Sequence, residues 1–176
     1  SSVSSATSTT EHELALTGLA AGTRYYYSIG TTATVLGSGL DHTFVTSPTP
    51  GTSTPTRIWV LGDSGTADAN ARAVRDAYLA FTGVRGTDVW LMLGDNAYDS
   101  GTDAEYQAAV FDTYPATLKQ VALWPTIGNH DTAQNQAPPP SIPYYAVFTL
   151  PTAAQAGGLA SGTEDYYSFD RGDVHF

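Results

Sequence analysis

The sequence predicts an α/β fold with a mostly parallel sheet, preceded by part of an all-β sandwich domain. After residue 56 the pattern runs strand, helix, strand, helix, strand, which is typical of a parallel sheet with right-handed crossovers. Before residue 47, short alternating and aromatic segments favour β-structure. The Pro- and Thr-rich stretch between them is typical of an extended linker. We therefore expect a partial sandwich over 1–47, a linker over 48–56 and half of an α/β domain over 57–176.

Three strands are expected in the first region. Polar and apolar residues alternate from Glu11 to Leu16, and the stretch from Arg24 to Ile29 is rich in aromatic residues. A third strand is expected from Thr43 to Val45. Because three strands are too few for an independent sandwich, we expect this chain to begin inside a domain.

The second region contains three short apolar runs that each end at a glycine. They span Arg57 to Leu61, Asp88 to Leu93 and Val121 to Ile127. Their nearly continuous apolar character predicts buried strands of a parallel sheet. A hairpin is expected later, around residues 171–172, where a turn separates two apolar segments.

A first helix is expected between the first two of these strands. It spans Asp68 to Phe81, and Gly83 ends it. Val74, Tyr78 and Phe81 recur at helical spacing, so we expect them to form the stripe that faces the core.

A second helix is expected before the third strand. Thr102 and Glu105 have the spacing of a capping box, and the helix that they open is expected to run to about Tyr114, where Pro115 stops it. The connection over 132–163 is too long for a passive loop, so it is expected to be functional or partly disordered.

The charge balance excludes several classes of partner. Charged residues make up 14% of the chain, the formal net charge is −10, and only one of the seven basic residues is a lysine. Such a surface does not bind nucleic acid through a basic patch, nor an anionic membrane surface. No apolar run approaches the roughly 18 residues of a membrane-spanning helix. The absence of cysteine excludes disulfides, thiolate catalysis and Cys-ligated metal sites.

The same composition gives an expectation about location. Few lysines and many Ser, Thr and Tyr residues favour a secreted protein, extracellular or periplasmic. The charge also poses a question about substrates, because an anionic substrate would need a source of positive charge other than Lys and Arg.

Metal-binding residue types follow each of the three apolar runs. The endings are Gly62-Asp63-Ser64-Gly65, Gly94-Asp95-Asn96-Ala97-Tyr98-Asp99 and Gly128-Asn129-His130-Asp131. Because the carboxyl ends of parallel strands form one crevice, we expect these side chains to converge. Carboxylate, phenol and amide oxygens suit hard or borderline cations, and two such cations can clamp a phosphate ester and activate a water.

These three motifs, in this order, resemble those of the calcineurin-like metallophosphoesterases. Most of that superfamily has a metal-binding histidine at the third position of the first motif, where this chain has Gly65. The purple acid phosphatases have glycine there and take a tyrosine from the second motif instead, and Tyr98 stands at that position. The resemblance to the purple acid phosphatase branch covers about residues 57–176.

The resemblance implies a dinuclear metal centre. Asp63 and Tyr98 would bind Fe³⁺, and Asp95 would bridge the two metals. Asn129 would bind the second metal, which is Fe²⁺, Zn²⁺ or Mn²⁺ in that family. His130 would contact the substrate phosphate or help to protonate the leaving group. The implied activity is that of an acid phosphatase, a phosphomonoesterase that uses a metal-activated water.

The family also uses three histidine ligands from two later motifs. Those motifs are absent from this sequence, in which His175 is the only histidine after His130. We therefore expect an incomplete fragment with doubtful activity of its own. Two alternatives stay open: a phosphodiesterase or nucleotide-cleaving relative that uses the same site, and an inactive fragment that acts only as a binding module. The oligomeric state is also open.

The first region carries a second resemblance. Leu19, Gly22, Thr23 and Tyr25 match a signature in the second half of fibronectin type III domains, in which the tyrosine docks back on its own loop. Such a domain before the catalytic domain is consistent with the phosphatase family.

Each candidate residue also has a structural explanation. Asp63 and Asn129 are common turn formers, and Tyr98 belongs to a chain that holds 11 tyrosines. For Asp99 and Asp131, roles in supporting other ligands or in capping a helix are at least as well founded as direct metal binding.

Overall fold

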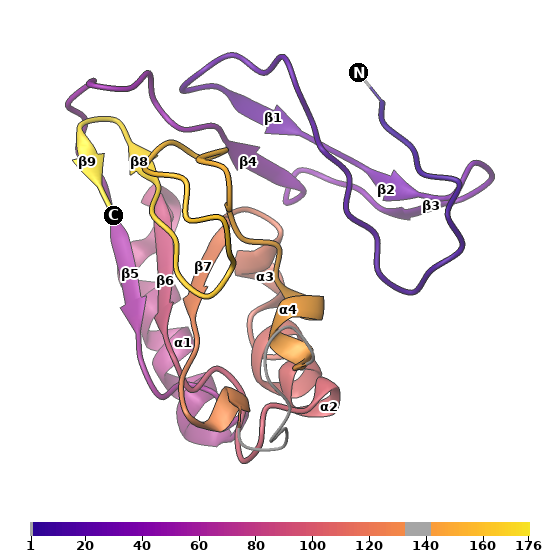
Figure 1. Cartoon of the computed structure of the whole chain (residues 1–176), viewed down its shortest axis with the longest axis vertical. Coiled ribbons are helices and arrows are strands. Elements are labelled where there is room, and N and C mark those ends of the chain that lie inside the picture. The colour runs from indigo at the N-terminus through magenta and orange to yellow at the C-terminus, as the bar shows by residue number, and fades with distance from the viewer. Residues whose placement is uncertain (1, 133–141) are drawn as a thin grey trace.

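A three-stranded parallel sheet forms the centre of the computed structural model, which describes residues 2–132 and 142–176. The strands are β5 (Ile58–Leu61), β6 (Val89–Leu93) and β7 (Leu123–Thr126), and they lie side by side in this order (Figure 1). Pairing is in parallel register, with Trp59 opposite Trp90 and Trp90 opposite Leu123. The expected mixed α/β architecture is therefore confirmed at this level.

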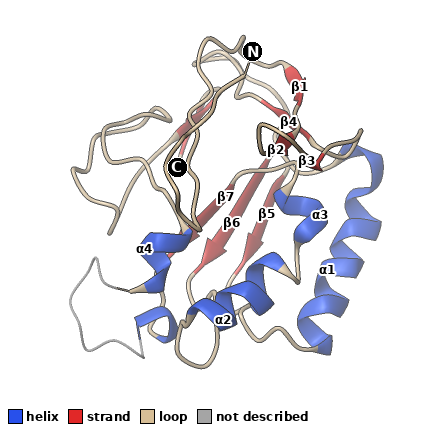
Figure 2. Ribbon diagram, turned by 90° about the vertical axis from the view of Figure 1, so that its right-hand side faces the viewer, coloured by secondary structure: helices blue, strands red, loops and turns tan. Residues whose placement is uncertain are grey.

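Helices cover one face of this sheet (Figure 2). They are α1 (Ala69–Thr82), α2 (Asp103–Tyr106), which continues as a π-helical turn over Gln107–Phe111, and α3 (Pro115–Leu118).

The core between the sheet and these helices is largely aromatic. Trp59 stacks on Tyr78 with ring centroids 4.0 Å apart, and Trp90 meets Tyr114 edge-on at 5.0 Å. Trp90 and Tyr114 are almost fully buried. Aromatic pairs in these geometries add stability beyond the area that they bury.

The other face of the sheet is only partly covered. Ile58, Val60 and Leu93 are 40%, 49% and 54% exposed, so the expectation that the strands are buried on both faces is wrong at these positions. The reason is the alternation of side chains along a strand, which points these three away from the helices.

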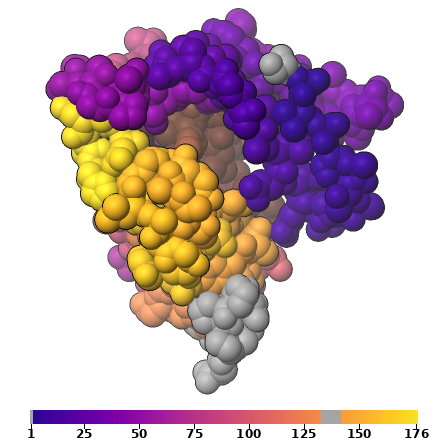
Figure 3. Space-filling model, turned by 45° about the horizontal axis from the view of Figure 1, so that its top comes forward, coloured from indigo at the N-terminus to yellow at the C-terminus, as the bar shows by residue number. Residues whose placement is uncertain are grey.

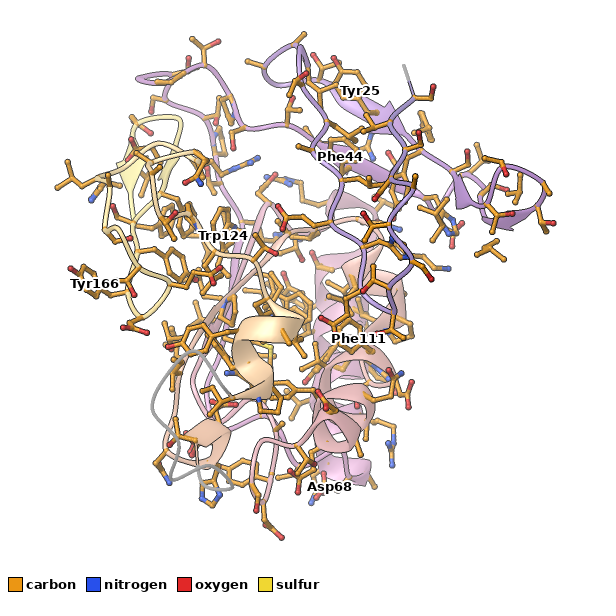
Figure 4. All side chains as sticks on the ribbon, turned by 45° about the vertical axis from the view of Figure 1, so that its right-hand side comes forward. Tyr25, Phe44, Asp68, Phe111, Trp124 and Tyr166 are labelled. Atoms are coloured by element: carbon orange, nitrogen blue, oxygen red, sulfur yellow. The ribbon has the colours of Figure 1, made fainter. Side chains whose placement is uncertain are left out.

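The C-terminal segment covers the rest of that face. Trp124 stacks on Phe169 at 3.8 Å and Phe169 on Phe176 at 4.7 Å. A cavity of about 350 Å³ remains between this segment and the sheet, beside Trp124 and Tyr166, which Figure 4 labels.

Helix α1 begins and ends as predicted. The Asp68 side chain caps it by accepting a hydrogen bond from the Ala71 amide at 2.8 Å, and Gly83 follows its last residue in the left-handed region at φ 50°.

The core-facing stripe of α1 is shifted from the predicted one. Val74 and Phe81 are 53% and 77% exposed, so the prediction that they belong to the core is wrong, whereas Tyr78 does face the sheet. The helix turns Arg75 inward instead, where its guanidinium donates to the Thr113 carbonyl. Phe81 lies under the Arg57 guanidinium, 5.5 Å from ring centroid to charge centre.

The second helical segment differs from prediction at its end. The capping box of Thr102 and Glu105 is present and opens α2. The segment ends at Phe111, before the predicted end near Tyr114, and Pro115 starts a separate helix, α3, because a proline at the first helical position sacrifices no intrahelical hydrogen bond.

A short helix, α4 (Pro143–Val147), lies inside the long connection that was expected to be functional or partly disordered. Residues 133–141 of that connection, where partial disorder was predicted, lie outside the described residues. The expected hairpin is confirmed: β8 (Asp170–Arg171) pairs antiparallel with β9 (Val174–His175), and the Phe169 and Phe176 backbones continue the pairing.

Two small antiparallel sheets form the first region. β1 (Arg24–Tyr26) pairs with β4 (Thr43–Val45), and β2 (Ile29–Gly30) pairs with β3 (Val35–Gly37). The strand predicted over residues 11–16 is wrong: all six residues are exposed, and none joins a ladder with another described strand.

Tyr25 docks back on its own loop. Its hydroxyl accepts a hydrogen bond from the Ala20 amide at 2.8 Å, and its ring stacks on Phe44 at 5.8 Å. Figure 4 labels both side chains.

The first region lies across one end of the sheet (Figure 1), and in the space-filling view its purple atoms run along the top of the molecule (Figure 3). The Tyr27 hydroxyl donates to the Lys119 carbonyl at 2.9 Å, and the Lys119 ammonium pairs with Asp41 at 2.8 Å. This ion pair with Lys119 lowers the pKa of Asp41 to about 2.

Candidate metal centre

The three candidate motifs follow the same end of the sheet. All three strands point toward the end where α2 lies (Figure 2). Asp63 follows β5 by two residues and Asp95 follows β6 by two residues, and both have a left-handed backbone with φ 53°. A left-handed backbone is uncommon for aspartate and mildly strained. Such strain is tolerated at functional sites, where the backbone conformation of the turn orients the side chain.

The Tyr98 hydroxyl joins the ends of β5 and β6. It lies 3.0 Å from Asp63 Oδ1 and 2.9 Å from Asp95 Oδ2, and it can donate to either carboxylate. Burial and the two carboxylates raise the pKa of the Tyr98 phenol well above its ordinary value. The single phenolic proton therefore sits among three hard oxygen donors.

The Asp95 carboxylate is buried and uses both of its oxygens. Oδ2 accepts from Tyr98, and Oδ1 accepts from the His130 amide at 2.9 Å. Desolvation alone would raise the pKa of Asp95, but these hydrogen bonds outweigh it and lower the pKa. The carboxylate is thus held ionised between the ends of β6 and β7.

The His130 ring is fixed from two sides. Its Nδ1 lies 2.7 Å from the Asp99 carbonyl oxygen, and its ring lies 4.3 Å from the Tyr98 ring, centroid to centroid. Because a carbonyl only accepts, Nδ1 carries a proton. Nε2 then has a lone pair in the neutral ring and becomes a donor in the imidazolium.

Asn129 lies in the same turn as His130, and its side chain is at the surface of the protein. Its backbone carbonyl accepts from the Thr132 hydroxyl at 3.0 Å. Its side chain is exposed and forms no hydrogen bond within the described part of the chain. The structure therefore brings Asp63, Asp95, Tyr98 and His130 into one connected group and leaves Asn129 next to it.

Gly65 has a steric reason to be glycine. A Cβ added there would lie 2.4 Å from the Ala97 nitrogen, a distance shorter than any that Cβ atoms normally reach in proteins. The Gly65 amide donates to the Asp95 carbonyl at 3.1 Å, and the Gly65 carbonyl accepts from the Tyr98 amide at 3.0 Å. The first and second motifs thus dock through their backbones, and no histidine fits at position 65 in this arrangement.

Sequence reasoning missed a further part of the site. The Glu105 carboxylate accepts from the Asp99 amide at 2.6 Å and from the Ser100 amide at 3.2 Å, in addition to its predicted bonds at Thr102. The capping box is visible in the sequence. No local sequence pattern, however, indicates that Glu105 also binds the backbone at Asp99, whose carbonyl contacts the His130 ring.

The donor set fits a hard cation in part. Asp63, Asp95 and Tyr98 offer three oxygen donors at one point, and a cation there would replace the phenolic proton. No group of three or more His, Cys, Asp or Glu side chains is gathered for a metal anywhere in residues 2–132 and 142–176. The donors that this chain offers beside the two aspartates are of other residue types: Tyr98 in the group itself, and Asn129 next to it.

Comparisons with known proteins do not assign this chain to a family. Neither the protein-family models nor the curated proteins gave a match. Among the helices of the described residues, none has both the length and the apolar character needed to cross a membrane.

Proposed function

We propose that this chain supplies part of the metal centre of a phosphoester hydrolase of the purple acid phosphatase type, within a metallophosphoesterase fold. The observation that carries the proposal is the Tyr98 hydroxyl between Asp63 and Asp95. Gly65, which leaves room for this arrangement, supports it. The proposal also rests on the three motifs of the sequence.

Each residue has a role in this proposal. Asp63, Tyr98 and Asp95 would hold Fe³⁺, and Asp95 together with Asn129 would hold a second metal, Fe²⁺, Zn²⁺ or Mn²⁺. When bound, the metals supply positive charge for the phosphate and activate water for hydrolysis. They would also answer the question that the net charge of −10 raises, since they replace Lys and Arg.

His130 is proposed to act on the substrate. Because its Nδ1 proton is held by the Asp99 carbonyl, the free Nε2 is the atom available to a phosphate oxygen or a leaving group. The imidazolium form donates a proton from Nε2, which is the direction that leaving-group departure requires.

Titration of the whole chain with Fe³⁺ tests the assignment of ligands. We expect a visible absorption band from the Tyr98 phenolate, and Tyr98→Phe should abolish it. Tyr26→Phe is the matched control, because Tyr26 is 61% exposed on β1 and should leave the band unchanged. A band of full intensity in Tyr98→Phe would show that another residue binds the iron.

A turnover assay tests the activity. We expect little or no hydrolysis of p-nitrophenyl phosphate by the isolated chain, since the three further histidine ligands implied by the resemblance are absent from its sequence. Parallel assays with bis(p-nitrophenyl) phosphate separate a monoesterase from a diesterase in any longer form that contains those ligands. From the same low lysine content and the many Ser, Thr and Tyr residues, we also propose that the protein is secreted.

A further inference from the structure

Asp131 is the most deeply buried carboxylate near the candidate metal centre. It is 1% exposed, and its partners come from three different segments. Oδ2 accepts from the Gly128 amide at 2.7 Å and from the Asn96 side-chain amide at 3.0 Å. Oδ1 accepts from the Tyr106 hydroxyl at 2.6 Å and from the Asn96 backbone amide at 3.1 Å.

These bonds cross between the two motifs that carry the candidate ligands. Gly128 belongs to the turn after β7, next to Asn129, and Asn96 directly follows Asp95 in the turn after β6. The second amide hydrogen of Asn96 goes to the Thr126 carbonyl at the end of β7, at 2.8 Å. Asp131 and Asn96 therefore tie the two turns together beneath the surface where the ligands lie.

Among the described residues, the groups that donate to Asp131 are all neutral. No arginine, lysine or histidine pairs with its carboxylate within the described ranges. A buried carboxylate without a counter-charge is costly, and it is tolerated here because each oxygen receives two or more hydrogen bonds.

We propose that Asp131 is a positioning residue that fixes the turn of Asn129 and His130 against the turn of Asp95 and Tyr98, so that the spacing of the metal ligands exists before metal binds. This inference rests on the proposed function, since it assumes that these residues bind metal. Asp131 itself touches neither metal nor substrate in this proposal. Residues that orient metal ligands from behind commonly change metal affinity about 10- to 100-fold when replaced.

Asparagine at this position cannot reproduce the contacts. With its NH₂ group at Oδ2, it would face the Gly128 and Asn96 amide hydrogens, which are also donors. With its NH₂ group at Oδ1, the Tyr106 hydroxyl could turn to accept, but the Asn96 backbone N–H would lose its shorter contact and keep only the one to Oδ2, at 3.3 Å. Either orientation therefore weakens or removes at least one buried hydrogen bond.

The test compares Asp131→Asn with Asp112→Asn in the whole chain. Asp112 is exposed and bonds only Gln107 through its side chain in the described structure, so the same chemical change there is a matched control. The first measurement is hydrogen exchange of the His130 amide without metal. This amide bonds Asp95, not Asp131, and so reports the alignment of the two turns. The second measurement is the Kd for Mn²⁺ by calorimetry.

We expect Asp131→Asn to speed exchange at His130 on the order of tenfold, because loss of a buried charge-assisted bond has about that weight. The Kd for Mn²⁺ should rise about 10- to 100-fold. Asp112→Asn should change neither. A folded Asp131→Asn chain with the exchange rate and Kd of the natural sequence overturns the inference.

Two further outcomes separate the inference from its premise. Failure of the unchanged chain to bind Mn²⁺ overturns the proposed function, and the His130 exchange rate then decides alone whether Asp131 aligns the turns. If Asp131→Asn does not fold, Tyr106→Phe decides, because it removes one donor and keeps the carboxylate. Tyr106→Phe should give a smaller increase in both quantities, and no increase in either overturns the inference.

Discussion

Gly128 lies so close to Asp95 that a Cβ at position 128 would stand 2.2 Å from the Asp95 carboxylate Oδ1. The absence of a side chain at Gly128 therefore allows the turn after β7 to pack closely against the turn after β6, which carries Asp95. We expect Gly128→Ala to displace the Asp95 carboxylate and to lower the free energy of unfolding by about 1–3 kcal/mol, as overpacking does. Chemical denaturation measures the loss, and Mn²⁺ calorimetry should show weaker binding.

Gly62→Ala is the control for this substitution. Gly62 directly follows β5, and Gly128 is the second residue after β7, but a Cβ added at Gly62 would meet only the Leu93 Cβ, at 3.8 Å, an ordinary contact. The free energy of unfolding should change by less than about 0.5 kcal/mol, as it does for surface substitutions that create no clash and remove no buried contact. Equal losses in the two variants would contradict the steric argument.

The elements that the sequence predicted well are those with local signals. The start of α1 near Asp68, its end before Gly83 and the start of α2 at the capping box were predicted correctly, because such signals act over a few neighbouring residues. The convergence of Asp63, Asp95 and Tyr98 was predictable for a topological reason, since parallel strands end at one edge of a sheet.

Contacts between distant segments were beyond sequence reasoning. The inward turn of Arg75 depends on the Thr113 carbonyl, 38 residues away, so the phase of the α1 stripe could not be read from apolar residues alone. Asp131 likewise has partners 25 and 35 residues away, in Tyr106 and Asn96. Its burial follows from tertiary packing, which leaves no local pattern.

The two faces of the sheet should respond differently to truncation. Met92 is fully buried under the helices, whereas Val60 is 49% exposed on the opposite face. We expect Met92→Ala to lower the free energy of unfolding by about 2–5 kcal/mol. Val60→Ala should cost less than about 1 kcal/mol, because only part of the removed surface was buried. A loss at Val60 as large as that at Met92 in denaturant titration would show that both faces are covered in solution.

The Tyr25 hydroxyl should stabilise the first region. It accepts the Ala20 amide hydrogen at 2.8 Å, so Tyr25→Phe leaves that donor without its partner. We expect a loss of about 0.5–1.5 kcal/mol, the usual net weight of one hydrogen bond. Tyr26→Phe, at the 61% exposed neighbouring position, should have no measurable effect in the same denaturation experiment. Indistinguishable stabilities for the two variants would argue against the docked tyrosine.

Asp88 should make the stability of the chain depend on pH in the acid range. Its carboxylate accepts from the Arg57 amide at 2.8 Å, pairs with Arg85, and pairs with Arg171 at 3.2 Å. Desolvation alone would raise the pKa of Asp88, but the hydrogen bonds from Arg85 and Arg57 outweigh it and lower the pKa. The contacts join the start of β5 to the C-terminal hairpin.

The sign of the effect follows from this lowered pKa. The unfolded chain protonates Asp88 near the ordinary value of about 3.9, above the pKa in the folded chain. The contribution of Asp88 is therefore fully present above about pH 4 and is lost as the pH falls through the folded pKa. At pH 7, we expect Asp88→Asn to lower the free energy of unfolding by about 1–3 kcal/mol, since it weakens hydrogen bonds to a charged group.

Denaturant titrations of both chains between pH 2 and pH 7 test this expectation. The difference in unfolding free energy between the natural sequence and Asp88→Asn should be constant from pH 7 to about pH 5 and should shrink below about pH 4. Asp173→Asn is the control, because Asp173 is exposed in the β8–β9 turn. If the difference in unfolding free energy stays constant down to pH 2, Asp88 keeps its ordinary pKa in the folded chain. The contacts with Arg57, Arg85 and Arg171 would then make no contribution to the pH dependence of stability.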